Sequence, residues 1–188
     1  IETKKNLIIF NPIASHYAFK KFDFRKNLVI NSSKQFNCTY ISVNLLGNES
    51  GKVIFEGDTI IASKGSLVSI SKRFSLEKYS LSFFDIDPEK KYPKQSIESI
   101  NIYEEFIDAF SLALLDYVSK SKLSGFALSL SGGLDSTCIA ILIYKMIYKV
   151  ISLKGIKEIN KRFNLNLTCS GDIENDTRLA VNNLLYTA

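Results

Sequence analysis

The sequence predicts an α/β fold, and three observations support this class. Short apolar runs that end in turn residues predict strands. Apolar residues at helical spacing predict helices at about 20–36 and 103–118. In the second half, the order strand, helix, strand, helix with long connections predicts parallel strands.

The first half carries the signals of one layered unit. Two apolar runs end in turn residues and are expected to be buried strands: 7–10 before Asn11-Pro12, and 40–46 before Gly47-Asn48. A helix is expected between them, over about 20–36. The β-rich segment 53–74 contains Lys64-Gly65, which predicts a hairpin.

The second half follows a change in composition. Two of the three prolines lie within 84–97, so we place a linker at 85–99 between domains at 1–84 and 100–188. A helix with one apolar stripe is expected next, formed by Tyr103, Phe106, Ile107, Phe110, Leu114 and Val118. The expected elements after it are a strand at 126–130, a helix at 136–150 packed between layers, a strand at 165–169 and a helix at 174–186.

Composition and charge exclude several classes of protein. The 188 residues carry a formal net charge of +5, with 15 basic against 10 acidic residues in 1–100 and 9 against 9 in 101–188. Because the basic residues are scattered, no nucleic-acid partner is expected. No apolar run reaches the roughly 18 residues of a membrane span, and no signal peptide opens the chain, so a cytoplasmic protein without a membrane segment is expected.

Cysteine and methionine usage adds two expectations. Cys38, Cys138 and Cys169 are far apart and lie in apolar sequence, which favours buried, reduced thiols. The only methionine is Met146. The chain is therefore expected to be part of a longer polypeptide.

The stretch LSLSGGLDSTCIA, residues 128–140, concentrates polar groups where a strand is expected to lead into a helix. Such a junction binds anions, because the helix start presents unpaired N–H groups and glycines let a ligand approach the backbone. Ser131, Ser136 and Thr137 can add hydroxyl donors, and Asp135 can join Mg²⁺ to phosphate oxygens. A plain turn with an N-cap at Asp135-Ser136 is the alternative. The pattern is neither a Walker A loop nor a nucleophile elbow.

SGGLDS resembles the PP-loop, SGGxDS, of the N-type ATP pyrophosphatases, which adenylylate a substrate oxygen and release pyrophosphate. LTCSGDIENDTRLAVNNL, residues 167–184, resembles the strand, loop and helix that follow this loop in NAD synthetase. The resemblance implies a site for ATP and Mg²⁺, with Asp135 as metal ligand. The implied ATP-binding residues are Ser129, Leu130, Ser131, Gly132, Gly133, Leu134, Asp135, Ser136, Thr137, Leu167 and Thr177.

NPIASHYAFKKF (11–22) and NLLGNESGKVIFEGDTIIASKG (44–65) resemble the later part of the nitrilase-type glutaminase domain of glutamine-dependent NAD synthetases. The implied fold is the C-terminal half of a nitrilase-like α-β-β-α sandwich, followed by the start of a parallel-sheet PP-loop domain of the adenine nucleotide alpha hydrolase-like type. Ser15 and Lys21 match positions that hold glutamine in this family. Lys20 stands where glycine is common, and His16 is expected to be a turn residue near the pocket.

The resemblance implies a ligase that amidates nicotinic acid adenine dinucleotide to NAD, consumes ATP, releases AMP and pyrophosphate, and takes ammonia from glutamine. The full-length enzyme is expected to be a homo-oligomer. The Glu-Lys-Cys triad of the glutaminase is expected upstream, Cys38 does not map onto its nucleophile, and no glutaminase catalytic residue is assigned. The isolated chain is expected to be inactive, because the triad and the C-terminal part of the synthetase are outside it.

Two alternatives stay open at this stage. The chain can belong to another PP-loop ATP-dependent ligase. It can also be a catalytically incomplete fragment that acts only as a nucleotide-binding or assembly module.

Overall fold

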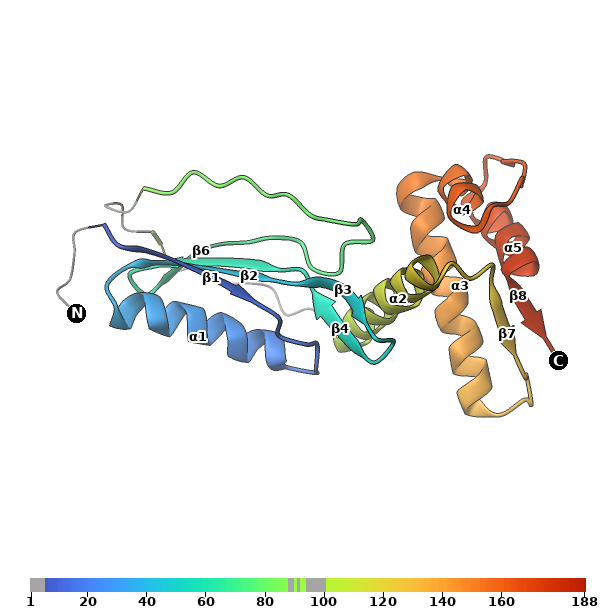
Figure 1. The fold of residues 1–188 in the computed structure, drawn as a ribbon, viewed down its shortest axis with the longest axis horizontal. Coiled ribbons are helices and arrows are strands. Elements are labelled where there is room, and N and C mark those ends of the chain that lie inside the picture. Colours follow the sequence, from blue (N-terminus) through green and yellow to red (C-terminus); the bar gives the residue numbers. More distant parts are fainter. Residues whose placement is uncertain (1–5, 88–89, 91, 94–100) are drawn as a thin grey trace. The chain divides into compact units, whose positions relative to one another are not determined.

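Two compact units make up the structure (Figure 1). The computed structural model describes residues 6–87, 90, 92–93 and 101–188, and the units are Ile1–Ile102 and Tyr103–Ala188. Each unit contains helices and strands, which confirms the α/β class. Most of the predicted linker at 85–99 lies outside the described residues.

The first unit is built on a four-stranded mixed sheet with the strand order β1-β2-β5-β6. Its strands are β1 (Ile8–Ile13), β2 (Thr39–Asn44), β5 (Thr59–Ser63) and β6 (Ser66–Ile70). β1 and β2 are parallel and are connected by helix α1 (Lys21–Gln35), while the other two pairs are antiparallel. α1 lies along one face of the sheet (Figure 1). The core of this unit contains Phe22, Val29, Ile60, Ala62 and Leu67.

Antiparallel hairpins complete this unit. Strands β3 (Leu46–Glu49) and β4 (Val53–Glu56) form a separate pair. Between β5 and β6, Lys64 and Gly65 have φ angles of 50° and 86°. Two successive residues with positive φ form the type I′ turn that matches strand twist, so the predicted hairpin is confirmed.

β1 is an edge strand, which differs from the buried strand that the sequence predicts. Its residues alternate between exposed and half-buried, and it continues through Asn11 and Pro12 to Ile13. Proline has no backbone N–H. It is tolerated in an edge strand because the N–H groups on the open side of that strand have no neighbouring strand to bond. Gly47 and Asn48 likewise lie inside β3 and do not end a strand.

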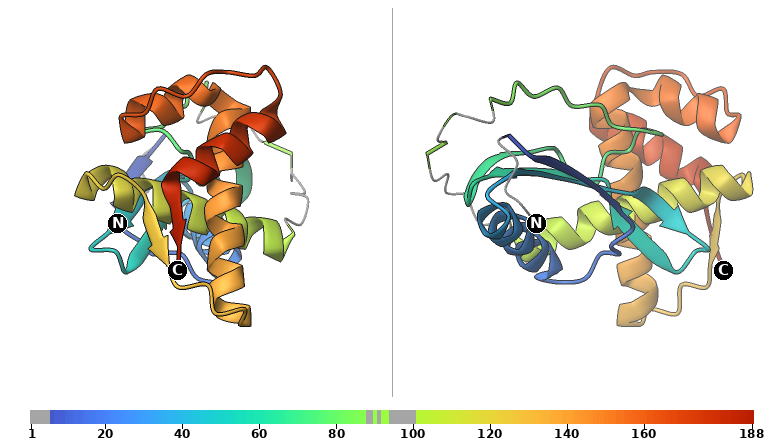
Figure 2. Two further views of the ribbon diagram at one scale, coloured as in Figure 1. Left: turned by 90° about the vertical axis from the view of Figure 1, so that its right-hand side faces the viewer. Right: turned by 60° about the vertical axis from the view of Figure 1, so that its left-hand side comes forward.

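The second unit combines four helices with a short parallel pair of strands. The helices are α2 (Ile102–Ser121), α3 (Leu134–Lys154), α4 (Ile156–Phe163) and α5 (Ile173–Leu184), and the strands are β7 (Phe126–Leu128) and β8 (Leu185–Thr187). α3 packs against α4 and α5 (Figure 2). Met146 and Ile147 of α3, Ile159 of α4 and Leu184 of α5 are fully buried.

The strand expected at 165–169 is not formed by the described residues. In this segment the backbone of Leu167 bonds the side chain of Asn160 instead. Asn160 Nδ2 donates to Leu167 O at 2.9 Å, and the Leu167 N–H donates to Asn160 Oδ1 at 3.0 Å. The amide of Asn160 therefore replaces a neighbouring strand. β7 instead pairs in parallel with β8. The predicted pairing is therefore wrong, and the helix predicted at 174–186 ends at Leu184, directly before β8 begins.

The helices differ from prediction in two ways. Tyr103, at the start of the predicted stripe, is 77% exposed, whereas Ala109, Leu112 and Leu115 are buried. Val118, at the end of the predicted stripe, is buried as expected, so the stripe matches only the C-terminal part of the buried side of α2. α4 was not predicted, although its buried residues Ile156, Ile159 and Phe163 have helical spacing.

Helix α3 corrects the sequence-based statement on membrane spans. It has 21 residues and an 18-residue window of mean hydropathy 1.5, so length and composition alone would let it cross a membrane. A core helix of a soluble protein meets the same criterion, which makes one such helix weak evidence. Only one side of α3 is buried, since Ile139 and Ile141 are exposed, so the predicted packing between layers is not seen in this chain.

The three cysteines are free, but only one is buried. Cys38 has the predicted environment, and burial raises the pKa of its thiol. The prediction of burial is wrong for Cys138, which lies on the exposed side of α3, and for Cys169, which lies in the connection before α5.

Candidate functional sites

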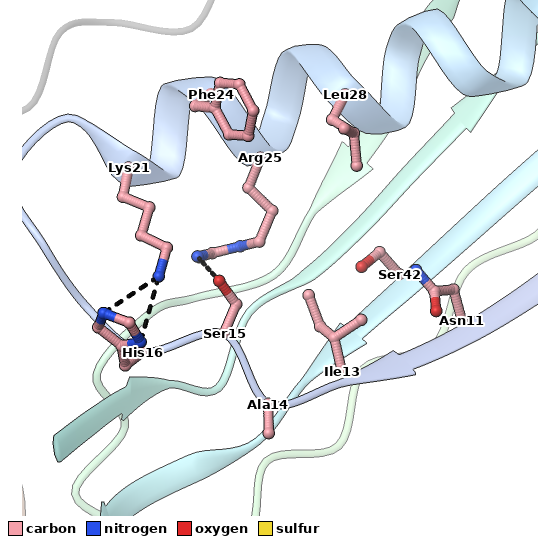
Figure 3. Close-up of a pocket in the computed structure, with 10 residues that line it drawn as sticks. All are labelled: Asn11, Ile13, Ala14, Ser15, His16, Lys21, Phe24, Arg25, Leu28 and Ser42. Carbon is pink, nitrogen blue, oxygen red and sulfur yellow. Dashed lines mark hydrogen bonds between the residues drawn. The ribbon is translucent and has the colours of Figure 1, made fainter.

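An open pocket of about 480 Å³ lies in the first unit where β1 leads toward α1 (Figure 3). Its lining is formed by Asn11, Ile13, Ala14, Ser15, His16, Lys21, Phe24, Arg25, Leu28 and Ser42. Ser15 and Lys21, the two residues predicted to hold glutamine, are both part of this lining. The structure therefore brings them together, while their role stays a prediction.

Asn44, the last residue of β2, fixes the backbone of the segment that carries Ser15. The Ser15 N–H donates to Asn44 Oδ1 at 2.9 Å, and Asn44 Nδ2 donates to Ser15 O at 3.0 Å. Asn44 Nδ2 also donates to Asp58 Oδ1 at 3.1 Å. The peptide groups beside Ser15 cannot rotate without breaking these bonds. The position of the Ser15 Cα, from which the side chain extends, is therefore fixed.

A buried cation lies behind Ser15. Arg25, from α1, is 4% exposed and donates to Asp58 through Nη2 at 2.7 Å and through Nε at 3.3 Å. Its Nη2 is 3.0 Å from Glu56 Oε2, and its Nη1 donates to Ser15 Oγ at 3.4 Å (Figure 3). Arg73 is paired with the same Glu56 oxygen at 2.7 Å. Two cations and two carboxylates, whose side chains are at most 7% exposed, thus compensate one another.

Glu56 is the most deeply buried member of this cluster, with 0% exposure. Burial raises the pKa of the Glu56 carboxyl above its ordinary value, against the opposite effects of Arg73 and Arg25. Glu56 does not line the pocket. Its contribution is to hold the two arginines.

Lys21 is the first residue of helix α1, and Lys20 is its N-cap. The Lys21 ammonium lies 3.3 Å from Nδ1 and 3.4 Å from Nε2 of His16 (Figure 3). His16 lines the pocket, near which it was expected, but it forms an isolated antiparallel bridge with Phe55 and is not in a turn. Lys20 has φ 64°, in the left-handed region. This conformation costs a residue with a Cβ about 1–2 kcal/mol, so the backbone at Lys20 suits glycine better than lysine.

The SGGLDS stretch connects β7 to α3. Gly132 has φ 78°, and a Cβ added there would meet nothing within 4 Å. Gly133 is the N-cap of α3, and no side chain of its own caps the helix. Ser136 and Thr137 hydroxyls donate to Gly133 O at 3.2 and 2.9 Å. The loop therefore presents backbone amides, with hydroxyls held nearby.

Asp135 lies in the first turn of α3 and is exposed, as are Ser129, Leu130, Ser131, Gly132, Gly133, Leu134 and Thr137. Among the described residues, no three His, Cys, Asp or Glu side chains form a group that could hold a metal ion. One carboxylate beside uncapped amides nevertheless suits Mg²⁺, because that ion commonly takes one or two carboxylates together with phosphate oxygens and water.

Two predicted ATP-binding residues are not brought to this loop. The connection between α4 and α5, which carries Leu167, lies at the C-terminal end of α3, whereas the SGGLDS stretch leads into its N-terminus (Figures 1 and 2). The backbone groups of Leu167 bind Asn160. Thr177 is fully buried, and its hydroxyl donates to Ile173 O at 2.6 Å. Neither residue offers a free polar group in this arrangement.

Asp176 ties the same connection to α5. Its carboxylate accepts from the Ser170 N–H at 2.7 Å and from Cys169 Sγ at 3.3 Å. The hydrogen bond from the Ser170 backbone lowers the pKa of the Asp176 carboxyl below its ordinary value of 3.8. Asp172 caps the helix by accepting from the Glu174 N–H at 3.0 Å.

Sequence reasoning missed three residues of the pocket region: Arg25, Asn44 and Asp58. Arg25 follows Lys21 by one helical turn, which puts both on the same side of α1. Asp58 is a charged residue between the apolar segments VIF and IIA. A charged residue within a strand-forming region could have indicated a buried ion pair, since buried charges require partners.

Two proteins of similar sequence are glutamine-dependent NAD(+) synthetases. No family model matches the chain. A glutamine-dependent NAD(+) synthetase of Synechocystis is 30% identical over 146 residues, which cover 76% of this chain and 25% of that protein. The corresponding enzyme of Bos taurus is 25% identical over an alignment of 219 residues in length. That alignment covers 96% of this chain and 29% of that protein.

Solved structures agree with these relatives. The crystal structure of a glutamine-dependent NAD(+) synthetase from Cytophaga hutchinsonii matches 98% of this chain with a TM-score of 0.82 and 34% identity, and 33% of that protein is covered. An enzyme of the same name from Acinetobacter baumannii, in complex with ADP, gives a TM-score of 0.65 at 21% identity and supports the fold alone. The chain spans about a quarter to a third of the length of these proteins.

Proposed function

We propose that this chain, which is homologous to a segment of the glutamine-dependent NAD(+) synthetases, supplies parts of two sites of such an enzyme. The first unit contributes to a glutamine site, in a nitrilase-like glutaminase domain. The second unit contributes a PP-loop that binds the phosphates of ATP. The observation that carries the proposal is the uncapped start of α3 behind Gly132, whose φ of 78° suits glycine.

In the proposed reaction the carboxylate of nicotinic acid adenine dinucleotide attacks the α-phosphorus of ATP, and pyrophosphate leaves. Ammonia then displaces AMP and gives NAD. Negative charge accumulates on the departing pyrophosphate. The N–H groups at the start of α3 donate to that charge, and preorganised donors of this kind can each stabilise a transition state by about 3 kcal/mol.

The hydroxyls of the loop exchange partners when phosphate binds. Ser136 and Thr137 donate to Gly133 O in the free chain, and in the complex they donate to phosphate oxygens. Ser131 Oγ is 3.4 Å from the Gly133 N–H, so a phosphate oxygen replaces it as the acceptor of that amide. Asp135 would hold Mg²⁺, which would neutralise part of the phosphate charge.

The pocket of the first unit suits glutamine in size and charge. Lys21 supplies a cation for a carboxylate, and Ser15 supplies a hydroxyl from a backbone that Asn44 holds in place. Ligand pockets of several hundred cubic ångströms with a few fixed polar groups are typical of small-molecule sites. Ammonia from glutamine is consumed by the synthetase reaction.

Pyrophosphate release tests the function directly. The protein expressed from its complete reading frame is incubated with ATP, Mg²⁺, nicotinic acid adenine dinucleotide and ammonium. We expect pyrophosphate to form only when the dinucleotide is present, and little or none to form with the 188-residue chain alone. Pyrophosphate release that does not depend on this dinucleotide would assign the protein to another PP-loop ligase, and no release at all would contradict the proposed activity.

A further inference from the structure

We infer that Arg25, held by Asp58, is a positioning residue that fixes the direction in which the Ser15 hydroxyl donates. The inference rests on the proposed glutamine site. Arg25 Nη1 donates to Ser15 Oγ at 3.4 Å. A serine hydroxyl has one hydrogen and two lone pairs, and a guanidinium can only donate. The arginine therefore occupies a lone pair and leaves the hydroxyl hydrogen for another acceptor.

The guanidinium has no freedom to release Ser15. Arg25 makes a two-point contact with Asp58, at 2.7 and 3.3 Å, and its Nη2 also contacts Glu56 at 3.0 Å. All three side chains are buried, so water does not compete for these bonds. Paired contacts of this kind fix the plane of the guanidinium as well as its position.

Ser15 is fixed from its backbone as well, through the two bonds to Asn44. Ser15 and Lys21 line the same pocket (Figure 3). The inferred arrangement leaves the hydroxyl hydrogen of Ser15 available to an acceptor on a ligand in that pocket. This part of the lining thus offers a hydroxyl donor and an ammonium. It selects a ligand oxygen that only accepts, as in a carboxylate, over an amide nitrogen, which needs acceptors.

A double-mutant cycle tests whether Arg25 acts through the Ser15 hydroxyl. The cycle measures kcat/KM for ammonia release from glutamine, in the protein from the complete reading frame. Ser15→Ala removes the hydroxyl, and we expect a loss of about tenfold or more, as for one hydrogen bond to a charged group. Arg25→Lys is expected to give a loss of similar size in the Ser15 protein. In the Ser15→Ala background it should change kcat/KM by less than about twofold, because its effect passes through the missing hydroxyl.

A second variant and a second ligand keep the test independent of folding. If the melting temperature shows that Arg25→Lys does not fold, Asp58→Asn takes its place in the cycle, because it loosens the guanidinium and keeps its volume. The wild-type protein should also prefer glutamine to L-glutaminamide as competing ligand, and Ser15→Ala should reduce that preference.

The outcomes separate the inference from the proposed function. Equal losses from Arg25→Lys, or from Asp58→Asn, in both backgrounds would indicate a purely structural role and overturn the inference, while the glutamine site would stand. Wild-type protein that releases no ammonia from glutamine would overturn the glutamine site and the inference together.

Discussion

The pocket of the first unit and the loop of the second unit hold their polar groups by different means. In the pocket, buried side chains hold the polar groups: Asn44 bonds the backbone of Ser15, and Asp58 bonds the guanidinium of Arg25. In the loop, the backbone supplies the donors at the start of α3, and the side chains around it are mostly exposed.

This difference predicts different sensitivities. A site built from buried, mutually bonded side chains loses stability when one partner is removed, because the remaining charge is left without compensation. A loop built from backbone amides keeps its stability when exposed side chains change, but its stability depends on the conformation of a few residues, Gly132 above all. The first two of the following substitutions each act on one of these constructions, and the third acts on the connection before α5.

The largest effect is expected from Arg25→Ala in the first unit. It leaves Asp58 and Glu56, with 1% and 0% exposure, without one of their cations, and the expected loss in the free energy of unfolding is about 3–5 kcal/mol. Lys26→Ala is the matched control on α1, since its pair with Asp23 at 2.6 Å is at the surface, and its expected cost is about 0–1 kcal/mol. Urea unfolding measures both, and equal losses would contradict a buried charge cluster.

A smaller effect is expected from Gly132→Ala in the second unit. The added Cβ has open space, but φ is 78°, so the expected cost is about 1–2 kcal/mol from backbone strain alone. Gly133→Ala is the control, because φ is −75° there, and its expected cost is below about 1 kcal/mol. Thermal unfolding compares the two variants, and a Gly133 variant that is the less stable of the pair would overturn the conformational argument.

The smallest effect concerns pH and Asp176. Its pKa is lowered in the folded chain, so the stability that it contributes is fully present above its ordinary value of 3.8 and is lost as the pH falls through the folded value. In Asp176→Asn that dependence should disappear. Urea unfolding between about pH 2 and pH 6 should give a difference between wild type and variant that grows with pH. A difference that stays constant across this range would show that the carboxylate charge plays no part.

Much of the fold was predictable because local signals agree with the final structure. The Lys64-Gly65 turn and helix α1 depend on neighbouring residues alone, and both were found. The strand at 165–169 failed because its alternative partner, the side chain of Asn160, gives no signal in a strand pattern. A strand was expected at 7–10, but β1 continues to Ile13 and is only half-buried, since an edge position depends on strands elsewhere in the chain.

The residues of the candidate sites also differ in how far they could be predicted from the sequence. The stretch around Gly132 could be found from sequence because its residues are adjacent. Ser15 and Lys21 could be found only through a resemblance, and Arg25, Asn44 and Asp58 were missed because they come from three separate segments. Long-range hydrogen bonds join these residues, and neither periodicity nor composition encodes such bonds.

Titration of Mg²⁺-ATP into the protein from the complete reading frame tests the central claim most directly. Wild-type protein should bind, and Asp135→Asn should bind about tenfold more weakly or worse, because the ion loses its carboxylate beside the phosphates. Asp172→Asn is the matched control, since Asp172 is also exposed at a helix start and an asparagine can keep its bond to the Glu174 N–H. Equal affinity in the wild-type and Asp135→Asn proteins would contradict a metal-assisted phosphate site at the start of α3.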